Sequence, residues 1–294
     1  MTLEMKNLTP LVTVIIPSYN HEKYIQESLE GIKRQTYANI EFFVVDDGSK
    51  DNSVELLQKL QPEYNFQLIL QKNRGLCKTL NSIVRERATG KYISICASDD
   101  IWEPKKLEWQ VNFMESNPEY GMCYGKAITI NENSEPVKSY TNENVKGGYI
   151  FDSLLVREFH PPVSYMYRAD VLEKVGYWRE DMALDDFYMN LKIAEEYPIG
   201  FIDEFIFSYR IHDENTAKRN PLRIFTSQRA IIDQYKHKEV YRKAVSEWHF
   251  RRFYHCSSYS KTKLNALVSL FYSLKYINRK EFRKAVYRMI AEWK

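Results

Sequence analysis

The chain has 294 residues, of which 44% are hydrophobic and 28% are charged, and its formal net charge is +3. This is the composition of an ordinary soluble globular protein, which excludes collagen-like, low-complexity and disordered classes. The four cysteines are scattered without a C-x-x-C spacing, so we expect reduced thiols in a cytosolic protein and no disulfide framework.

The start of the chain carries no targeting or membrane-spanning pattern. Residues 1–10 are polar and of mixed charge, so we expect no signal peptide. The apolar run at 11–17 is far shorter than the roughly 20 residues of a membrane span. We therefore expect that the chain does not cross a bilayer by itself.

Four short apolar runs alternate with helical patterns over the first hundred residues. Residues 11–17, 40–45, 66–70 and 91–96 are apolar or β-branched and predict strands of a parallel sheet. The segments between them place apolar residues at helical spacing, and Gly90 ends the helix before the fourth strand. This alternation predicts an α/β fold with a doubly wound, mainly parallel, Rossmann-like sheet and right-handed crossovers.

Further helices and strands follow. A proline near the start of 104–115 favours a helix there. Residues 121–130 predict a strand that enters a polar hairpin, 184–196 predict a helix, and 199–211 predict another strand.

Basic charge is concentrated at the C-terminal end. From Lys218 onward there are 19 lysines and arginines against five acids, whereas the first 217 residues hold 23 basic and 34 acidic side chains. Apolar residues recur at helical intervals among the basic ones. We therefore expect a domain at 1–217 and a basic helical C-terminal extension at 218–294.

The extension predicts a partner. Its basic residues are mixed with aromatic ones, namely Trp248, Phe250, Phe253, Tyr254 and Tyr272. This mixture is typical of contact with an anionic membrane surface. Two alternatives stay open: the charges only solvate the outer faces of terminal helices, or they bind another protein or nucleic acid, of which nucleic acid is the less favoured.

Two pairs of adjacent aspartates follow predicted strands. Asp46 and Asp47 close the second strand, and Asp99 and Asp100 close the fourth. Because ligands gather at the carboxyl ends of the strands in an open α/β sheet, both pairs should face one crevice. Clustered carboxylates repel one another unless a cation offsets them, so this pattern predicts a divalent metal with a phosphorylated substrate. The alternative for the second pair is helix capping.

Seven short motifs occur in order over about residues 11–216. They are VIIPSYN at 14–20, VVDDGS at 44–49, N-x-G at 73–75, A-x-G-K-Y-I at 88–93, S-D-D-x-W at 98–102, LDD at 184–186 and Y-R-x-H at 209–212. Each motif alone is weak, but the ordered set is specific. Together they resemble the inverting family 2 glycosyltransferases of the GT-A type, which implies sugar transfer from a nucleotide-diphosphate donor.

The resemblance implies a donor site at the ends of the first two strands. Asp47 would accept a hydrogen bond from the donor's base, with Asp46 beside it. Tyr19 would stack on that base, with Pro17 and Ser18 lining the pocket. An aromatic ring and a carboxylate suit a uracil-like base, which favours a UDP-sugar; the alternative for Tyr19 is core packing.

The resemblance also implies a metal and diphosphate site. Asp100 would be a ligand of Mn²⁺ or Mg²⁺, and Asp99 would hold the ribose or assist the metal. His212 would be a further metal ligand or a phosphate contact, unless it is structural, and Arg210 would lie near the diphosphate. The chain departs from the fullest motif, D-x-D-D, because Ala97 stands at the place of the first acid.

A second departure concerns the loop and helix at 73–81. Leu80 stands where many relatives carry an arginine. Arg74 and Lys78 are therefore candidates for the positive charge near the diphosphate, with Asn73 in the same loop. The alternative is that both are solvated helix residues.

Asp186 is the candidate catalytic base. It matches the acid-acid motif of the family, with Asp185 as its neighbour, and the alternative is an N-cap pair. A base that takes the proton of an acceptor hydroxyl for backside attack would invert the anomeric centre. Trp178 and His160 would line the side of the site that binds the acceptor.

These features predict a metal-dependent, inverting hexosyl- or N-acetylhexosaminyltransferase. It would move one sugar from a UDP-sugar to a growing, lipid-linked bacterial surface glycan, in the cytoplasm or on the inner face of the membrane. An alternative keeps the fold but changes the acceptor to a polyprenyl phosphate, a protein or a small molecule. An alternative of another class is a non-catalytic protein that binds nucleic acid or a membrane surface.

Overall fold

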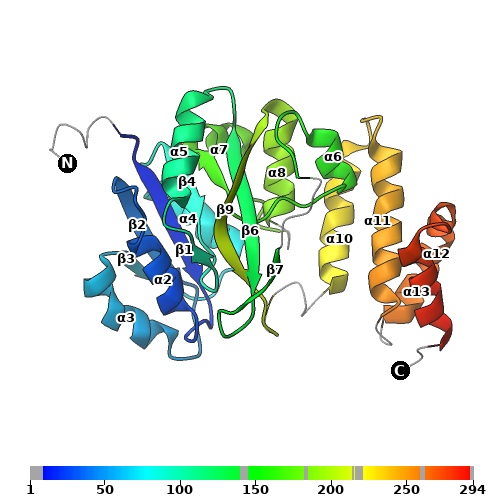
Figure 1. Cartoon of the computed structure of the whole chain (residues 1–294), viewed down its shortest axis with the longest axis horizontal. Helices are drawn as coiled ribbons and strands as arrows, with labels where there is room; N and C mark the ends of the chain where they lie inside the picture. Colours follow the sequence, from blue (N-terminus) through cyan, green and yellow to red (C-terminus); the bar gives the residue numbers. More distant parts are fainter. Residues whose placement is uncertain are drawn as a thin grey trace. The chain divides into compact units, whose positions relative to one another are not determined.

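The computed structural model describes residues 9–139, 145–181, 185–213, 215, 221–258 and 262–291. These residues form two compact units (Figure 1). The first contains the described residues up to 150 and those of 159–215, and the second contains 151–158 and the described residues from 221 onward. The segment at 151–158 thus groups with the C-terminal helices, which no sequence pattern indicates. The functional domain boundary near residue 217 stays a prediction.

The first unit is built on one sheet, whose described part has nine strands. Its strands are β1 (Val12–Ser18), β2 (Ile40–Asp46), β3 (Gln67–Leu70), β4 (Tyr92–Ile95), β5 (Ile101–Trp102), β6 (Met122–Ile130), β7 (Pro136–Ser139), β8 (Met166–Arg168) and β9 (Ile199–Arg210). Their order in the sheet is β3-β2-β1-β4-β8-β6-β9-β5, and β7 pairs with β6.

The N-terminal half of the sheet is parallel. β1 pairs in parallel with β2 and β4, and β2 pairs in parallel with β3. Residues 12–16 are all buried, as expected of an apolar strand that is covered on both faces. The crossovers run through α2 (Ile25–Lys33), α3 (Ser53–Tyr64) and α4 (Leu76–Glu86). The predicted α/β fold with a mainly parallel sheet and a helical C-terminal region is confirmed.

The remaining strands bring a further chain segment to the same edge of the sheet. β8 runs antiparallel to both β4 and β6, and β6 pairs in parallel with β9. β9 therefore points the same way as β1, β2 and β4, and the carboxyl ends of all four lie at one edge. The helices of this part are α5 (Lys106–Ser116), α7 (Ala169–Val175) and α8 (Asp185–Glu196).

One lysine lies in the core of the first unit. The Lys106 side chain is fully buried, its Nζ donates to Ser94 Oγ (3.0 Å) and Gln110 Oε1 (2.5 Å), and it lies 3.8 Å from the centroid of the Trp102 ring. Burial lowers the pKa of Lys106 to about 7, because the core solvates an ammonium ion poorly. The alkyl chain of Lys106 is thus buried in the core, and its ammonium group is hydrogen-bonded to two polar side chains.

Lys106 should make stability depend on pH. The unfolded chain binds more protons than the folded one between the folded pKa of about 7 and the ordinary value of 10.5. The free energy of unfolding should therefore rise with pH in this window, by up to about 1.4 kcal/mol per pH unit. Urea unfolding of the wild type and of Lys106→Met at pH 7, 8 and 9 should show this slope only in the wild type. Lys105→Met, at an exposed neighbour, is the control, and equal slopes in wild type and Lys106→Met would contradict the assignment.

The second unit is helical. It consists of α6 (Phe151–Val156), α10 (Pro221–Ile232), α11 (Tyr241–Cys256), α12 (Lys263–Ser273) and α13 (Lys280–Ala291), with short 3₁₀ turns at Asp233–Tyr235 and Leu274–Tyr276. α11 contacts each of the other four helices. Within the described residues, every helix is too short or too polar to cross a bilayer.

The structure corrects the expected position of three aromatic residues. Trp248, Phe250 and Phe253 are buried, because α11 is covered on several sides. The Trp248 indole donates to the carbonyl of Phe225 (2.9 Å), and the Phe253 ring lies 5.3 Å from that of Phe282. The prediction that these three aromatic residues face a membrane surface is wrong, and they form the core of the unit instead.

Candidate functional site

The loops after β1 and β2 are joined by hydrogen bonds. Asn20 has a left-handed backbone (φ 56°), its amide donates to Ser49 Oγ (2.8 Å), and its Oδ1 accepts from the Lys50 amide (2.7 Å). The Asp46 carboxylate accepts from the amides of Gly48 (3.1 Å) and Ser49 (2.8 Å) and from the Ser49 hydroxyl (2.6 Å). Asp46 therefore holds this turn in place, and its buried carboxylate is engaged by protein groups.

Asp47 fastens the loop that leads into α4. Its Oδ1 accepts from Gln71 Nε2 (2.7 Å) and the Arg74 amide (2.9 Å), and its Oδ2 accepts from the Gly75 amide (2.8 Å). A carboxylate can accept about four hydrogen bonds. Asp47 thus retains capacity for about one further donor, which is the number that its predicted contact with a base requires.

Four of the predicted donor-binding side chains are exposed. Tyr19 is 39% exposed, and Asn73, Arg74 and Lys78 are exposed on the loop before α4 and on its first turn. The Arg74 guanidinium donates to the carbonyl of Lys78 (3.4 Å). These four side chains have the access to solvent that ligand contact needs.

The two residues before Tyr19 are less accessible. Pro17 is half-buried and Ser18 is buried. The Ser18 hydroxyl has no hydrogen-bond partner among the described residues. Direct contact of the Ser18 side chain with a donor would therefore require this loop to move.

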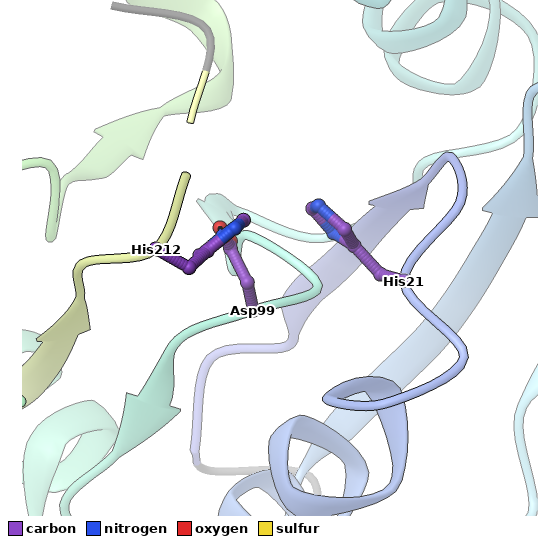
Figure 2. Close-up of side chains that lie close together, drawn as sticks. All are labelled: His21, Asp99 and His212. Carbon is purple, nitrogen blue, oxygen red and sulfur yellow. Dashed lines mark hydrogen bonds and ion pairs between the residues drawn. The ribbon is translucent and has the colours of Figure 1, made fainter. Parts of the chain in front are cut away.

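His21, Asp99 and His212 come together from three separate loops (Figure 2). His212 Nε2 lies 2.9 Å from Asp99 Oδ2, and both side chains are buried. His21 follows β1, and its ring centroid is 5.7 Å from that of His212. Its Nδ1 lies 2.7 Å from Ser98 Oγ. One possible ligand atom from each of the three residues lies within 4.8 Å of the others.

The three side chains fit a divalent transition metal. Ligands held about 2.0–2.3 Å from one ion lie up to about 4.5 Å apart, so the cluster needs to close only slightly. His212 Nδ1 is buried without a hydrogen-bond partner in the described part of the chain, which marks the ring as one whose polar environment is incomplete. Two imidazoles and one carboxylate suit a metal such as Mn²⁺ better than Mg²⁺, which prefers oxygen ligands.

Asp100 lies outside this cluster. It is buried, and its Oδ1 accepts from the Arg210 amide (2.9 Å). Burial, followed by the neighbouring Asp99 charge, raises the pKa of Asp100 well above its ordinary value. The cluster of possible ligands thus contains Asp99 and not Asp100, and the metal-ligand role of Asp100 stays a prediction.

Arg210 supports the loop that carries Asp99. Its side chain is 0% exposed, and its Nε donates to the Asp99 carbonyl (2.7 Å). Its other nitrogens donate to Ser134 Oγ (2.8 Å) and to Glu27 Oε2 (2.9 Å), and the guanidinium lies 4.8 Å from the centroid of the Tyr24 ring. A guanidinium engaged and buried in this way holds the Asp99 backbone, and the predicted role of Arg210 near the diphosphate stays a prediction.

Asp186 lies in the first turn of α8, beside a histidine. Its Oδ2 is 3.2 Å from His160 Nε2, and the His160 side chain is more exposed than that of Asp186. The two residues are far apart in sequence, and no motif indicates this contact. The side chain of Asp185 lies outside the described residues.

Trp178 differs from the expectation that it lines the acceptor side, and Asn215 is a residue near Asp99 that the sequence analysis does not single out. Trp178 is buried, with its ring centroid 5.8 Å from that of Tyr167, so it does not offer an exposed face to a sugar. Asn215 accepts from the His212 amide (2.8 Å) and donates to Asp99 Oδ2 (3.5 Å). Its position three residues after His212 is the only signal in the sequence for this role.

Comparisons with known proteins show what the chain is similar to. The model of glycosyl transferase family 2 matches residues 13–176. An uncharacterised glycosyltransferase of Methanocaldococcus jannaschii is 30% identical over 249 residues, which cover 81% of this chain and 84% of that protein. A putative teichuronic acid biosynthesis glycosyltransferase of Bacillus subtilis is 38% identical over 112 residues, or 37% of this chain and 44% of that protein.

Solved structures share the fold. S. aureus TarS residues 1–349, in complex with UDP-GlcNAc, match with a TM-score of 0.65 and 17% identity over 96% of this chain and 90% of that one. A mannosyltransferase of Pyrobaculum calidifontis, in complex with GDP-Man and Mn²⁺, matches with a TM-score of 0.63 and 19% identity over 97% of this chain and 85% of that one.

Proposed function

The chain belongs to glycosyl transferase family 2, and from this premise we propose that it is a metal-dependent, inverting transferase of a single sugar from a UDP-sugar. The observation that carries the proposal is the cluster of His21, Asp99 and His212. It lies at the strand edge where Asp47 and the exposed Tyr19 ring also lie. Donor base, diphosphate and cation would then share one edge of the sheet.

Asp99, His212 and His21 would hold the cation, for which Mn²⁺ is the favoured identity and Mg²⁺ the alternative. Bound there, a divalent cation would offset negative charge on the leaving diphosphate. Asp47 would accept one hydrogen bond from the base, and Tyr19 would stack on it. Asn73, Arg74 and Lys78 would contribute exposed polar and positive groups close to the donor.

Asp186 would act as the general base. The oxygen of the acceptor hydroxyl forms the new bond to the anomeric carbon, and its proton passes to the Asp186 carboxylate. The bond between that carbon and the diphosphate oxygen breaks, and its electron pair leaves with UDP. Attack from the face opposite the leaving group inverts the anomeric centre. His160, 3.2 Å from Asp186 Oδ2, would keep the carboxylate in place.

The acceptor would be a growing bacterial surface glycan carried on a lipid, at the inner face of the cell membrane. A relative named for teichuronic acid biosynthesis supports a glycan acceptor. A polyprenyl phosphate, a protein or a small molecule is the alternative acceptor for the same fold. Membership in an enzyme family favours catalysis over a non-catalytic binding role.

A screen of donors and metals tests the proposal. Purified protein is incubated with UDP-GlcNAc, UDP-glucose, UDP-galactose and GDP-mannose, each with Mn²⁺, Mg²⁺ or EDTA, and released nucleoside diphosphate is measured. We expect release from a UDP-sugar and not from GDP-mannose, and a rate at least about tenfold higher with Mn²⁺ than with Mg²⁺ because of the imidazole ligands. Release that is undiminished in EDTA would contradict metal dependence, and a preference for GDP-mannose would contradict the donor assignment.

A further inference from the structure

α12 turns an apolar face toward solvent. Leu264, Leu267, Val268 and Phe271 are all exposed, Leu264 by 78% and Phe271 by 72%. Their spacing of three and four residues places them on one side of the helix. We refer to these four residues as the α12 stripe. Leu274 and Ile277, in the turn that follows, are also exposed.

The opposite face of α12 is buried although it carries small and polar residues. Ala266, Ser269 and Ser273 are buried. The Arg252 guanidinium, on α11, donates to Ser269 Oγ (2.9 Å) and Asn265 Oδ1 (2.6 Å). These charge-assisted hydrogen bonds fix the rotation of α12 about its axis. The stripe is therefore held toward solvent by specific contacts. The apolar face of α12 is exposed and its polar face is buried, which is the inverse of an ordinary surface helix.

Positive charge accompanies the stripe. Between residues 262 and 291 the sole acid is Glu281, and α12 itself contains none. Lys275, Lys280, Arg283 and Lys284 are exposed in the turn after α12 and on α13. An apolar stripe that is followed along the chain by exposed bases has the chemistry of a helix that lies in the interface of an anionic bilayer.

We propose that the α12 stripe inserts into the surface of a membrane that contains anionic lipid, with the neighbouring lysines and arginine on the lipid headgroups. A second copy of the chain would bring the same positive charges together, which disfavours it as the occupant. A nucleic acid would pair with the bases but would leave the stripe exposed. The proposal deepens the membrane location of the acceptor proposed above by naming the element that would contact the membrane, and its test does not depend on sugar transfer.

Vesicle sedimentation tests the inference. The full chain is mixed with vesicles of phosphatidylcholine alone or with 30% phosphatidylserine, and bound protein is measured after centrifugation. We expect the partition coefficient on anionic vesicles to be at least about tenfold higher than on neutral ones, and the double variant Leu267→Ser/Phe271→Ser to lose at least about tenfold. The control is Val137→Ser/Tyr149→Ser, which removes two exposed apolar residues of the first unit and should bind as the wild type does.

Two further readouts separate the outcomes. Circular dichroism and donor hydrolysis without vesicles should be unchanged in Leu267→Ser/Phe271→Ser, so loss of vesicle binding reflects the stripe and not misfolding or failure of the catalytic site. Equal binding by this variant and the wild type would overturn the inference, as would a wild type that hydrolyses donor but ignores both kinds of vesicle. A self-association that the variant loses, seen by analytical ultracentrifugation, would overturn it in favour of a second copy.

Discussion

Asp186→Asn is expected to lower the turnover of sugar transfer by about 10³-fold, because a positioned general base contributes about 10²–10⁴-fold. Asparagine keeps the size of the side chain but cannot accept the proton of the acceptor hydroxyl. Donor binding should change little, because the base acts on the acceptor hydroxyl and not on the donor. The measurement pairs the rate of UDP release in the presence of acceptor with the donor Kd from isothermal titration calorimetry.

Asp185→Asn is the matched control, since it removes the same charge one residue earlier on the same helix. We expect its turnover to stay within about tenfold of the wild type, with the loss due to altered charge at the start of α8. Should Asp185→Asn abolish turnover while Asp186→Asn does not, the base has been assigned to the wrong acid. If both variants also lose donor binding, the effect lies in the fold of α8 and not in proton transfer.

Asp99→Ala is expected to weaken Mn²⁺ binding by at least about 100-fold, because it removes the carboxylate ligand and leaves two imidazoles. Turnover should fall with it and should not recover at saturating donor. Binding can be followed without catalysis by electron paramagnetic resonance of free Mn²⁺ during titration of the protein in the presence of UDP.

Asp100→Asn separates the two neighbouring acids. Burial raises the pKa of Asp100 and so favours its uncharged form, which asparagine resembles, and the amide oxygen can still accept from the Arg210 amide. We expect its Mn²⁺ affinity to stay within about threefold of the wild type. A large loss of Mn²⁺ affinity in Asp100→Asn, with little loss in Asp99→Ala, would restore the assignment that the sequence alone suggests.

The sequence predicts the frame of the site well. The strands at 12–18, 40–46 and 92–95 lie where apolar, β-branched runs indicate them, because a doubly buried strand leaves a strong compositional pattern. From that frame alone, Asp47 and Asp99 are expected at one edge of the sheet, and they are found there. The R-x-H motif joins them because β9 runs parallel to β6.

What the sequence does not predict are the directions of side chains in turns. Asp99 and Asp100 are adjacent and chemically identical, yet one contacts His212 and the other the Arg210 amide. No periodicity governs such a turn, so the pattern cannot tell them apart. The sequence does not single out His21 for a related reason. Its closeness to His212 is set by strand pairing across the whole sheet.

The helical unit shows the same limit on a larger scale. Basic and aromatic residues alternate along 218–294, and this pattern predicts amphipathic helices without indicating which helix lies at the centre. Phe253 on α11 is buried, whereas Phe271 on α12 is exposed. The difference arises from the packing of four helices around α11 and from the hydrogen bonds of Arg252, neither of which is a local property of the sequence.

The most direct test of the central claim is the position of the metal. Crystals grown with UDP and Mn²⁺, measured on both sides of the manganese absorption edge, should show one anomalous peak within about 2.3 Å of Asp99 and His212, with His21 as a further ligand. A peak beside Asp100 with Asp99 turned away, or UDP bound without any manganese peak at this edge of the sheet, would contradict the account.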